Sequence, residues 1–424
     1  MHLDGGNMDK KIELYDIKSN KFTTKTITVY LCDKLDSQRA SYNSLLISVL
    51  KRGTRKMPTF TDMVIYGQEL YDTKIYADVE KKGEIQVVSF TVSMVDEKFI
   101  RDSQGIFNKS VDFLHEVITD PLLENGLFKK EYVEQEKVNL CDLIDSKIND
   151  KASYASARCF EEMCKNEHYG IDIDGDKEII KDIDNKKLYE YYKNTFLKKM
   201  MVKIFATGDL NEENIEYINK IFGYMTKEVD KLPIDTGELH PAPAQMKNII
   251  DRMNVLQSKI CMGFRTMTKA GDEDYYSLAM ANMILGGGTE SKLFLKIRER
   301  ESMAYYIHSR IDKFKGVMII SGGIEVQNKD KVIKLIMQEL EEIKIGNISD
   351  DEFGAAINSY IDAVNQLQDG QRTLSDYYLG QYLCGVTYNV EKSIEKVKAV
   401  TKESVAKAAQ KIQLDTVYTL EPNN

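Results

Sequence analysis

The pattern of apolar and polar positions in the first half of the chain predicts strands and helices in a definite order. Period-two alternation indicates strands, and apolar residues at helical spacing indicate helices. The expected order is strand, helix, helix, strand, strand, over residues 24–31, 42–50, 61–71, 73–79 and 85–93. Helices over 109–118 and 186–194 and a strand over 201–206 complete this half.

The second half of the chain repeats this order. Its expected elements are strand 259–264, helix 276–285, a helix that begins near Thr289, strands 305–311 and 317–320, helices 331–343 and 402–411, and strand 416–420. Matching positions lie about 234 residues apart at first and about 221 residues apart later, as an internal duplication requires. We therefore expect an α+β fold of two tandem homologous half-domains, each with an antiparallel-type sheet packed with helices.

The expected half-domains are residues 8–230 and 248–424, and a linker over 231–247 joins them. The linker contains Pro233, Pro241 and Pro243 and few large apolar side chains. This composition is typical of a connecting segment between domains.

Composition excludes several classes of protein. The 424 residues carry a net charge of -9, and 42% of them are hydrophobic. Without a basic stripe the chain is not expected to bind nucleic acid, and no run approaches the roughly 20 apolar residues of a membrane-spanning helix. The six cysteines are dispersed and form no CxxC pair, which favours reduced thiols and a cytoplasmic location.

The most distinctive stretch covers residues 285–309 and reads LGGGTESKLFLKIRERESMAYYIHS. Its three glycines favour a left-handed helix exit, and Thr289 is expected to cap the next helix. Arg298 then falls near the end of that helix and Tyr305 opens the following strand, so a guanidinium and a phenol are expected on neighbouring elements. On composition alone, a solvated arginine and a core tyrosine are the commoner outcomes.

Several motifs together carry a family resemblance. They are the second-half segment LGGGxxSxLFxxIRExxxxAYxI, a first-half helix that ends in LxxGT, and two α+β halves with a proline-bearing linker. This combination resembles the insulinase/pitrilysin family of zinc metallopeptidases over nearly the whole chain. The segments VLKRGTRKMPTFTDM and ELYDTKIYADVEKKGEIQVVSFTVSMVDEKF resemble a catalytically inactive bacterial branch, whose genes are typically paired with that of an active paralogue.

The family's zinc site lies on a first-half helix as His-x-x-Glu-His, in which the histidines bind zinc and the glutamate activates water. The resemblance places Ser44 and Ser48 at the histidines and Ile47 at the glutamate, which implies no metal and no catalytic residue in this chain. The third ligand position falls at Ile144 or at Asp145. Independently of this alignment, no two of the five histidines lie four residues apart, as a helical zinc pair requires.

The sequence offers one other set of possible metal ligands. Cys159, Cys164 and His168 have spacings that a metal could use. A buried amphipathic helix with free cysteines is the commoner structure for such a segment.

The resemblance gives Arg298 and Tyr305 a role, because the family uses an arginine and a tyrosine at this spacing to hold the substrate backbone. We therefore expect a non-catalytic subunit that binds a peptide substrate and pairs with a zinc-bearing paralogue, or with itself as a homodimer. Zinc is expected only in the partner subunit, and no nucleic acid or membrane is expected as a partner. A structural scaffold and a stand-alone peptide-binding protein are the alternatives.

Overall fold

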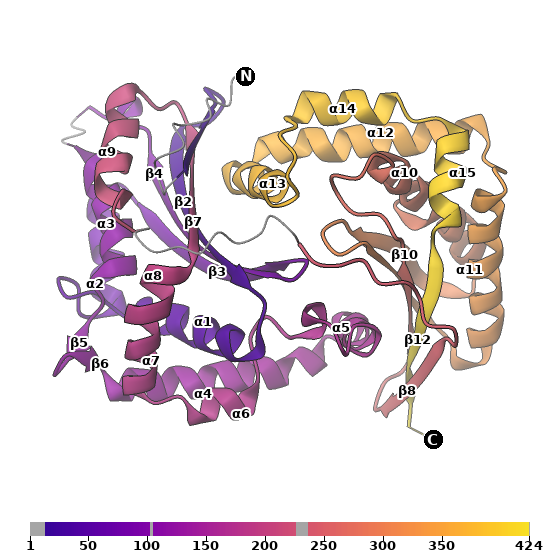
Figure 1. Cartoon of the computed structure of the whole chain (residues 1–424), viewed down its shortest axis with the longest axis horizontal. Coiled ribbons are helices and arrows are strands. Elements are labelled where there is room, and N and C mark those ends of the chain that lie inside the picture. The colour runs from indigo at the N-terminus through magenta and orange to yellow at the C-terminus, as the bar shows by residue number, and fades with distance from the viewer. Residues whose placement is uncertain (1–12, 102–104, 226–235, 424) are drawn as a thin grey trace. The chain divides into compact units, whose positions relative to one another are not determined.

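The computed structural model describes residues 13–101, 105–225 and 236–423. The chain divides into two compact units, each built on one five-stranded sheet (Figure 1). Residues 231–235 of the expected linker lie outside the described part of the chain. Within that part, no helix combines the length and the apolar character needed to cross a membrane.

The sheet of unit 1 is antiparallel except at one edge. Its strands lie in the order β1-β7-β2-β4-β3, and β1 pairs with β7 in parallel. Side chains alternate along β2, so that Ile27, Val29 and Leu31 face the core of the unit together. The strands are β1 Glu13–Lys18, β2 Thr24–Lys34, β3 Lys74–Lys82, β4 Ile85–Val95 and β7 Met201–Gly208.

Helices pack against this apolar face of the sheet. The side chain of Asp36 caps the buried helix α1 by accepting a hydrogen bond from the backbone N–H of Arg39. Thr59 and Asp62 form reciprocal capping bonds at the start of α2. The helices are α1 Ser37–Leu50, α2 Phe60–Glu69, α3 Ile106–Thr119, α4 Lys130–Ser146, α6 Lys177–Asp182, α7 Asn185–Tyr191, α8 Leu197–Lys199 and α9 Glu212–Phe222.

The sheet of unit 2 repeats the topology of unit 1. Its order is β10-β11-β9-β12-β8, with β8 parallel to β12 and the other pairs antiparallel. The strands β8, β9, β10, β11 and β12 thus take the places of β1, β2, β3, β4 and β7. They span β8 Lys247–Met253, β9 Ser258–Arg265, β10 Ala304–Asp312, β11 Val317–Ile324 and β12 Gln413–Pro422.

The helices of unit 2 also follow the duplicated order. Ser349 and Thr401 cap α12 and α15 through capping boxes with Glu352 and Ser404. The helical segments are α5 Lys151–Met163, α10 Tyr275–Gly286, η5 Phe294–Arg300, α11 Lys329–Lys344, α12 Asp350–Gln366, α14 Val390–Lys398 and α15 Lys402–Gln410. One further helix, α13 Gln371–Leu383, is divided between the two units.

The predicted α+β fold with two similar halves is confirmed by the matching strand orders. The sequence pattern does not predict β1 and β8, the parallel strands at the sheet edges. β8 alternates between half-buried and exposed residues, since it pairs on one side only. Its apolar signal is therefore weak.

The two compact units do not coincide with the two halves of the sequence. Residues 146–171, which include α5, belong to unit 2, and residues 370–379, which begin α13, belong to unit 1. Because α5 and α13 are equivalent helices of the repeat, each half contributes the same element to the other unit. The half-domain boundaries at 8–230 and 248–424 stay a prediction.

α5 docks on the sheet of unit 2 through apolar contacts. Gly263 of β9 permits this approach, since a Cβ at that position would lie 2.7 Å from the sulfur of Met163. Burial raises the pKa of the Cys159 thiol well above its ordinary value, so this side chain behaves as a neutral apolar group. The fully enclosed residues of this contact are Ala155, Cys159, Cys261, Ile319, Tyr418 and Leu420.

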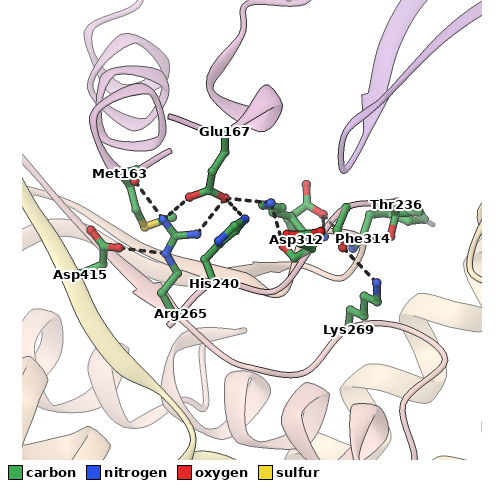
Figure 2. Close-up of polar contacts among 12 residues, drawn as sticks. Met163, Glu167, Thr236, His240, Arg265, Lys269, Asp312, Phe314 and Asp415 are labelled. Atoms are coloured by element: carbon green, nitrogen blue, oxygen red, sulfur yellow. Dashed lines mark hydrogen bonds and ion pairs between the residues drawn. The ribbon is translucent and has the colours of Figure 1, made fainter. Parts of the chain in front are cut away.

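A buried ion-pair network fixes the segment that follows α5 (Figure 2). The carboxylate of Glu167 accepts hydrogen bonds of 2.7 and 3.1 Å from Arg265 and lies 2.8 Å from Nζ of Lys315. Asp415 of β12 accepts a bond of 2.9 Å from Nε of Arg265. Although burial acts to raise it, the hydrogen bonds from Arg265 and Lys315 hold the pKa of Glu167 below its ordinary value.

Lys315 of this network and a further lysine, Lys269, also hold the segment around Gly237 and Glu238. Nζ of Lys315 donates to the carbonyl oxygen of Glu238 at 2.9 Å. Nζ of Lys269 donates to the carbonyl oxygen of Gly237 at 3.0 Å (Figure 2). Unit 2 therefore anchors both the α5 segment and this part of the connecting chain around one cluster of charges.

We predict that Glu167→Gln loosens the α5 segment in unit 2. The change removes the negative charge that neutralises the buried Arg265 and Lys315. Breaking such a buried pair costs about 3–5 kcal/mol of folding free energy. Hydrogen exchange of the amides in residues 151–171 should accelerate. The control Glu161→Gln, an exposed change on α5, should leave this exchange unchanged. Equal exchange in both variants would contradict the assigned role of Glu167.

Residues 370–379 dock on the sheet of unit 1 through polar contacts instead. Nε2 of Gln371 donates to the carbonyl oxygens of Thr24 and Thr207 at 2.7 and 2.9 Å. The hydroxyls of Thr207 and Ser375 lie 2.9 Å apart. Nζ of Lys82 lies 2.6 Å from a carboxylate oxygen of Asp376.

A second carboxylate shares this lysine. Glu80 lies 3.4 Å from Nζ of Lys82, on the same strand. Burial raises the pKa of Glu80 to about 7, with Asp376 adding to this rise and Lys82 opposing it. Between the unfolded value of 4.5 and about 7, docked Glu80 therefore binds more protons than released Glu80.

We predict that docking of residues 370–379 weakens as pH rises through this window. Above about pH 7, Glu80 is deprotonated in both states, and the stabilisation from its bound proton in the docked state is lost. The population of the locally open state should therefore increase about tenfold from pH 5 to pH 8. Hydrogen exchange, corrected for intrinsic rates, measures this population. Glu80→Gln should remove this dependence, and Glu69→Gln on α2 should not. A pH profile that Glu80→Gln leaves unchanged would exclude Glu80 as the titrating group.

Candidate functional site

α1 carries the three positions that the resemblance assigns to the zinc motif. Ser44 and Ile47 are only 3% and 7% exposed, and Ile47 belongs to the core of unit 1. The Ser44 hydroxyl donates to the carbonyl oxygen of Ile173 at 3.0 Å. The Ser48 hydroxyl donates to the carbonyl oxygen of Ser44 at 3.2 Å. These positions therefore supply neither an imidazole nor a general base.

The loop before α6 lies against α1 at this point. The carbonyl oxygen of Ile173 accepts a second bond, of 3.1 Å, from Gln86, and the backbone N–H of Asp176 donates to Oγ of Ser41 at 2.8 Å. Gly175 has a φ of +91°, and a Cβ there would lie 2.4 Å from Cα of Ser41. The chain thus satisfies the polar groups of α1 with its own loop.

The third-ligand position does not complete a metal site. Ile144 packs against the apolar core of unit 1. The Asp145 side chain is 63% exposed, and its oxygens lie 2.5 and 2.6 Å from Nζ of Lys177. The hydroxyls of Ser44 and Ser48 donate to backbone carbonyl oxygens, and Ile47 stands in place of the general base. These side chains therefore do not fit the zinc ion that the family binds.

The other possible metal ligands are core residues. Cys159 and Cys164 are fully buried, and burial raises the pKa of Cys164 to about 12. His168 begins a short 3₁₀ turn after α5. Among the residues that the structure describes, no group of three or more His, Cys, Asp or Glu side chains could hold a metal ion.

The glycine run after α10 serves close packing. Gly287 has a φ of -80°, and none of the three glycines adopts a left-handed conformation, so that prediction was wrong. A Cβ at Gly286 would lie 2.7 Å from the backbone nitrogen of Ser309. Glycine is needed here because β10 approaches the end of α10 closely.

The next helical segment has an unusual geometry. It begins after Ser291, so the predicted cap at Thr289 was also wrong. Within it the backbone N–H of Glu301 donates at 3.0 Å to the carbonyl oxygen of Lys296, five residues back. Such π-helical turns are rare and often mark functional sites.

Arg298 lies within this π-helical segment, η5. Its guanidinium carbon is 4.6 Å from the centroid of the Phe294 ring, and its side chain is 44% exposed. Its nearest carboxylate oxygen, on Glu299, lies 3.7 Å away. The aromatic ring thus supports the stem of the arginine, while the forked donors stay available to a ligand.

Tyr305 lies at the start of the edge strand β10. The strand register shifts between Ala304 and Tyr306, which makes Tyr305 the extra residue of a β-bulge. Its side chain is 75% exposed, so it is not the core tyrosine that composition favours. The backbone N–H of Met303 donates to the carbonyl oxygen of Ile297 at 2.9 Å and closes the turn between η5 and β10.

The structure therefore brings Arg298 and Tyr305 to one junction, as expected for neighbouring elements. Among the described contacts, no hydrogen bond or ion pair joins the two side chains, and both are exposed. Their polar groups are available to a ligand that lies across the junction.

Sequence reasoning missed the buried polar residues that bond one another beside the lost zinc motif on α1. Nδ2 of Asn43 donates to Gln86 at 2.8 Å, and the hydroxyl of Tyr191 donates to Asn43 at 2.9 Å. The available signal was the occurrence of Asn43 in an apolar helix and of Gln86 in an apolar strand. A buried amide in such a pattern requires partners.

The fold and site together define a class of protein. Two duplicated α+β units with a first helix that lacks metal ligands describe a metallopeptidase-like protein without catalytic groups. A family model described as "Peptidase M16 inactive domain" matches residues 182–360. The chain is 32% identical over 405 residues to "Probable inactive metalloprotease YmfF" of Bacillus subtilis (strain 168), covering 96% of this chain and 94% of that protein.

This chain belongs to the peptidase M16 family, which confirms the resemblance to insulinase/pitrilysin peptidases. It is 23% identical over 293 residues to "Uncharacterized zinc protease YmxG" of the same organism, covering 68% of each chain. A solved structure of a conserved protein from Enterococcus faecalis V583 is similar, with 27% identity, a TM-score of 0.89 and coverage of 98% of this chain and 97% of that chain.

We predict that restoring the motif residues will not restore zinc binding. The variant Ser44→His, Ile47→Glu, Ser48→His removes the bond from Ser44 to the loop but keeps the bonds of the loop to Gln86 and Ser41, so the loop still covers α1. The third ligand is still missing. Metal analysis should find well under one equivalent of tightly held zinc. One equivalent, together with chelator-sensitive peptide cleavage, would contradict this account of the site.

Proposed function

We propose that this protein is the catalytically silent subunit of a zinc peptidase, in which a zinc-bearing paralogue cleaves the peptide. The partner holds the metal, and this chain supplies Arg298 and Tyr305 to the shared substrate site. The observation that carries the proposal is the 75% exposure of Tyr305 on a β-bulge that directly follows the segment carrying the exposed Arg298. Within the part of the chain that the structure describes, Arg298 contacts only its helical neighbours Phe294 and Glu299.

The comparisons support a pairing of silent and zinc-bearing chains. The inactive relative and the relative named as a zinc protease occur in the same organism, and this chain is similar to both. A homodimer would leave the complex without a metal, because α1 carries none of the required ligands. The heterodimer is therefore the favoured assembly.

The chemistry of the two side chains suits this role. During peptide hydrolysis the scissile carbonyl becomes an oxyanion, and a phenol that donates to it stabilises the transition state more than the starting amide. A guanidinium can bond a neighbouring substrate carbonyl with its forked donors and align the peptide. Neither function requires a metal in this chain.

We predict that Tyr305→Phe lowers kcat of the reconstituted pair by about a hundredfold, the usual cost of one oxyanion donor. The variant should leave complex formation and the zinc content of the partner unchanged, since an exposed hydroxyl contributes little to folding. Steady-state peptide hydrolysis measures the effect. Tyr71→Phe, which alters another exposed tyrosine, is the control and should be silent.

We also predict that Arg298→Ala acts mainly on KM, because the arginine aligns the peptide in the ground state as well as in the transition state. Arg300→Ala, on the same π-helical segment, is the matched control. A structural scaffold would show no effect of either Tyr305→Phe or Arg298→Ala. A stand-alone peptide-binding protein would lose peptide affinity without changing the turnover of any partner.

A further inference from the structure

One face of the unit 2 sheet carries a row of aromatic and cationic side chains along its edge. Tyr306, His308 and Arg310 occupy alternate positions of β10 and therefore share one face. In register across the sheet, Tyr306 lies opposite Gly323 of β11, and Gly323 lies opposite Lys259 of β9. The three strands thus bring Lys259 into line with the first residue of the row.

The geometry of the row is defined by contacts between its members. The rings of Tyr306 and His308 are nearly parallel, at 29°, with centroids 6.0 Å apart. Nζ of Lys259 lies 5.5 Å from the centroid of the Tyr306 ring. At the other end, the guanidinium carbon of Arg310 lies 5.9 Å from the centroid of the Phe160 ring on α5.

Gly323 gives the row its close packing. A Cβ at Gly323 would lie 2.7 Å from the ring of Tyr306 and 3.5 Å from Nζ of Lys259. Any larger residue would separate the tyrosine from the lysine. The glycine therefore lets the aromatic ring lie across β11 beside the ammonium group.

The two cations of the row are not neutralised within the described residues. No carboxylate there lies within ion-pair distance of Lys259 or Arg310, whereas Arg158 on α5 pairs with Glu161 and Glu162. In a chain of net charge -9, two cations at the ends of one row, each without a carboxylate within ion-pair distance, call for an explanation.

The carboxylates nearest to the row are engaged elsewhere. Asp150, which Lys259 influences electrostatically, accepts hydrogen bonds from the backbone N–H groups of Ala152 and Ser153 and caps α5. Asp312, the next residue on the same face of β10, accepts a bond of 2.8 Å from the hydroxyl of Tyr169. Neither carboxylate lies within ion-pair distance of Lys259 or Arg310, although Asp150 attracts Lys259 at longer range.

We propose that this row, Lys259, Tyr306, His308 and Arg310, selects extended peptides that carry acidic side chains at alternate positions. An extended peptide and a strand share the same spacing, about 6.6–6.8 Å for every second residue. A peptide that lies along β10 over this face therefore presents every second side chain to the row. It meets Arg310 at one end and, at the other, Nζ of Lys259, which extends from β9 to the Tyr306 ring. The aromatic rings between them cover the apolar parts of the peptide.

This inference deepens the proposed function, because it names the class of peptide at the surface next to Tyr305. It rests on peptide binding by this chain and not on the hydrolytic partner. The two proposals can therefore fail separately. If Tyr305→Phe has no effect on turnover, the proposal of a shared catalytic site is refuted. The proposal that this row selects acidic peptides is not affected by that result.

Fluorescence anisotropy with the purified full chain tests the inference. The probes are two C-terminally amidated nonapeptides of the same apolar background, one with glutamate and one with glutamine at three alternate positions. The glutamate probe should bind about tenfold more tightly, since each exposed ion pair contributes up to about fivefold. The selectivity should fall as salt rises, because these charges are accessible to counterions.

Substitutions assign the selectivity to the row. Lys259→Gln and Arg310→Gln should each lower the ratio of the two affinities about threefold, and the double variant should bring it to about one without weakening the glutamine probe. Lys334→Gln, an exposed change on α11 of the same unit, should leave the ratio unchanged.

Three results would overturn the inference. They are equal affinity for the two probes, a selectivity that survives in the double variant, and a preference that appears only with peptides bearing a free C-terminal carboxylate. The last result would mean that Lys259 and Arg310 bind the C-terminal carboxylate of a peptide instead of its acidic side chains. Circular dichroism of the double variant confirms folding, which the exposed position of Arg310 leads us to expect to be unchanged.

Discussion

The carboxylate of Glu167 is the group on which the arrangement of unit 2 depends. It neutralises Arg265 and Lys315, two cations that are 3% and 1% exposed, and it belongs to a segment that comes from the other half of the sequence. Because unpaired buried charges are costly, the docking of this segment stabilises the folded state of unit 2. The equivalent helix, α13, begins in unit 1, so neither unit is built from one sequence half alone.

The two dockings differ in their chemistry, although they use equivalent helices. α5 lies in an apolar contact with Cys261, Tyr418 and Leu420, and the hydrophobic effect depends little on pH. Residues 370–379 dock through amides, hydroxyls and the pair of Lys82 with Asp376. Contacts of this kind are individually weak, so the docking of residues 370–379 lacks the large apolar contact that stabilises α5.

The sequence predicts the fold well because its signals are local and repeated. Alternating strands, apolar residues at helical spacing and the repeat of the same order in both halves suffice for the order of elements along the chain. The half-exposed strands β1 and β8 and the short strands β5 (Leu123–Glu124) and β6 (Leu127–Phe128) are not predicted, and neither is the order of strands within each sheet. The site is predicted in part. Arg298 and Tyr305 are placed correctly on neighbouring elements, but the π-helical turn and the bulge depend on tertiary packing. Likewise, no local pattern indicates that Ile173 covers the α1 position of the lost motif.

The contrast between the two candidate regions argues for a role outside folding. Around α1 the polar groups of Asn43, Ser44 and Gln86 bond within the chain, so that region is fully accounted for by stability. Tyr305 is 75% exposed, and the bulge that presents it interrupts a strand ladder. A side chain that buries so little surface adds little to the free energy of unfolding. The exposure of Tyr305 is therefore not explained by folding, and it is consistent with the proposal that this phenol contacts a peptide.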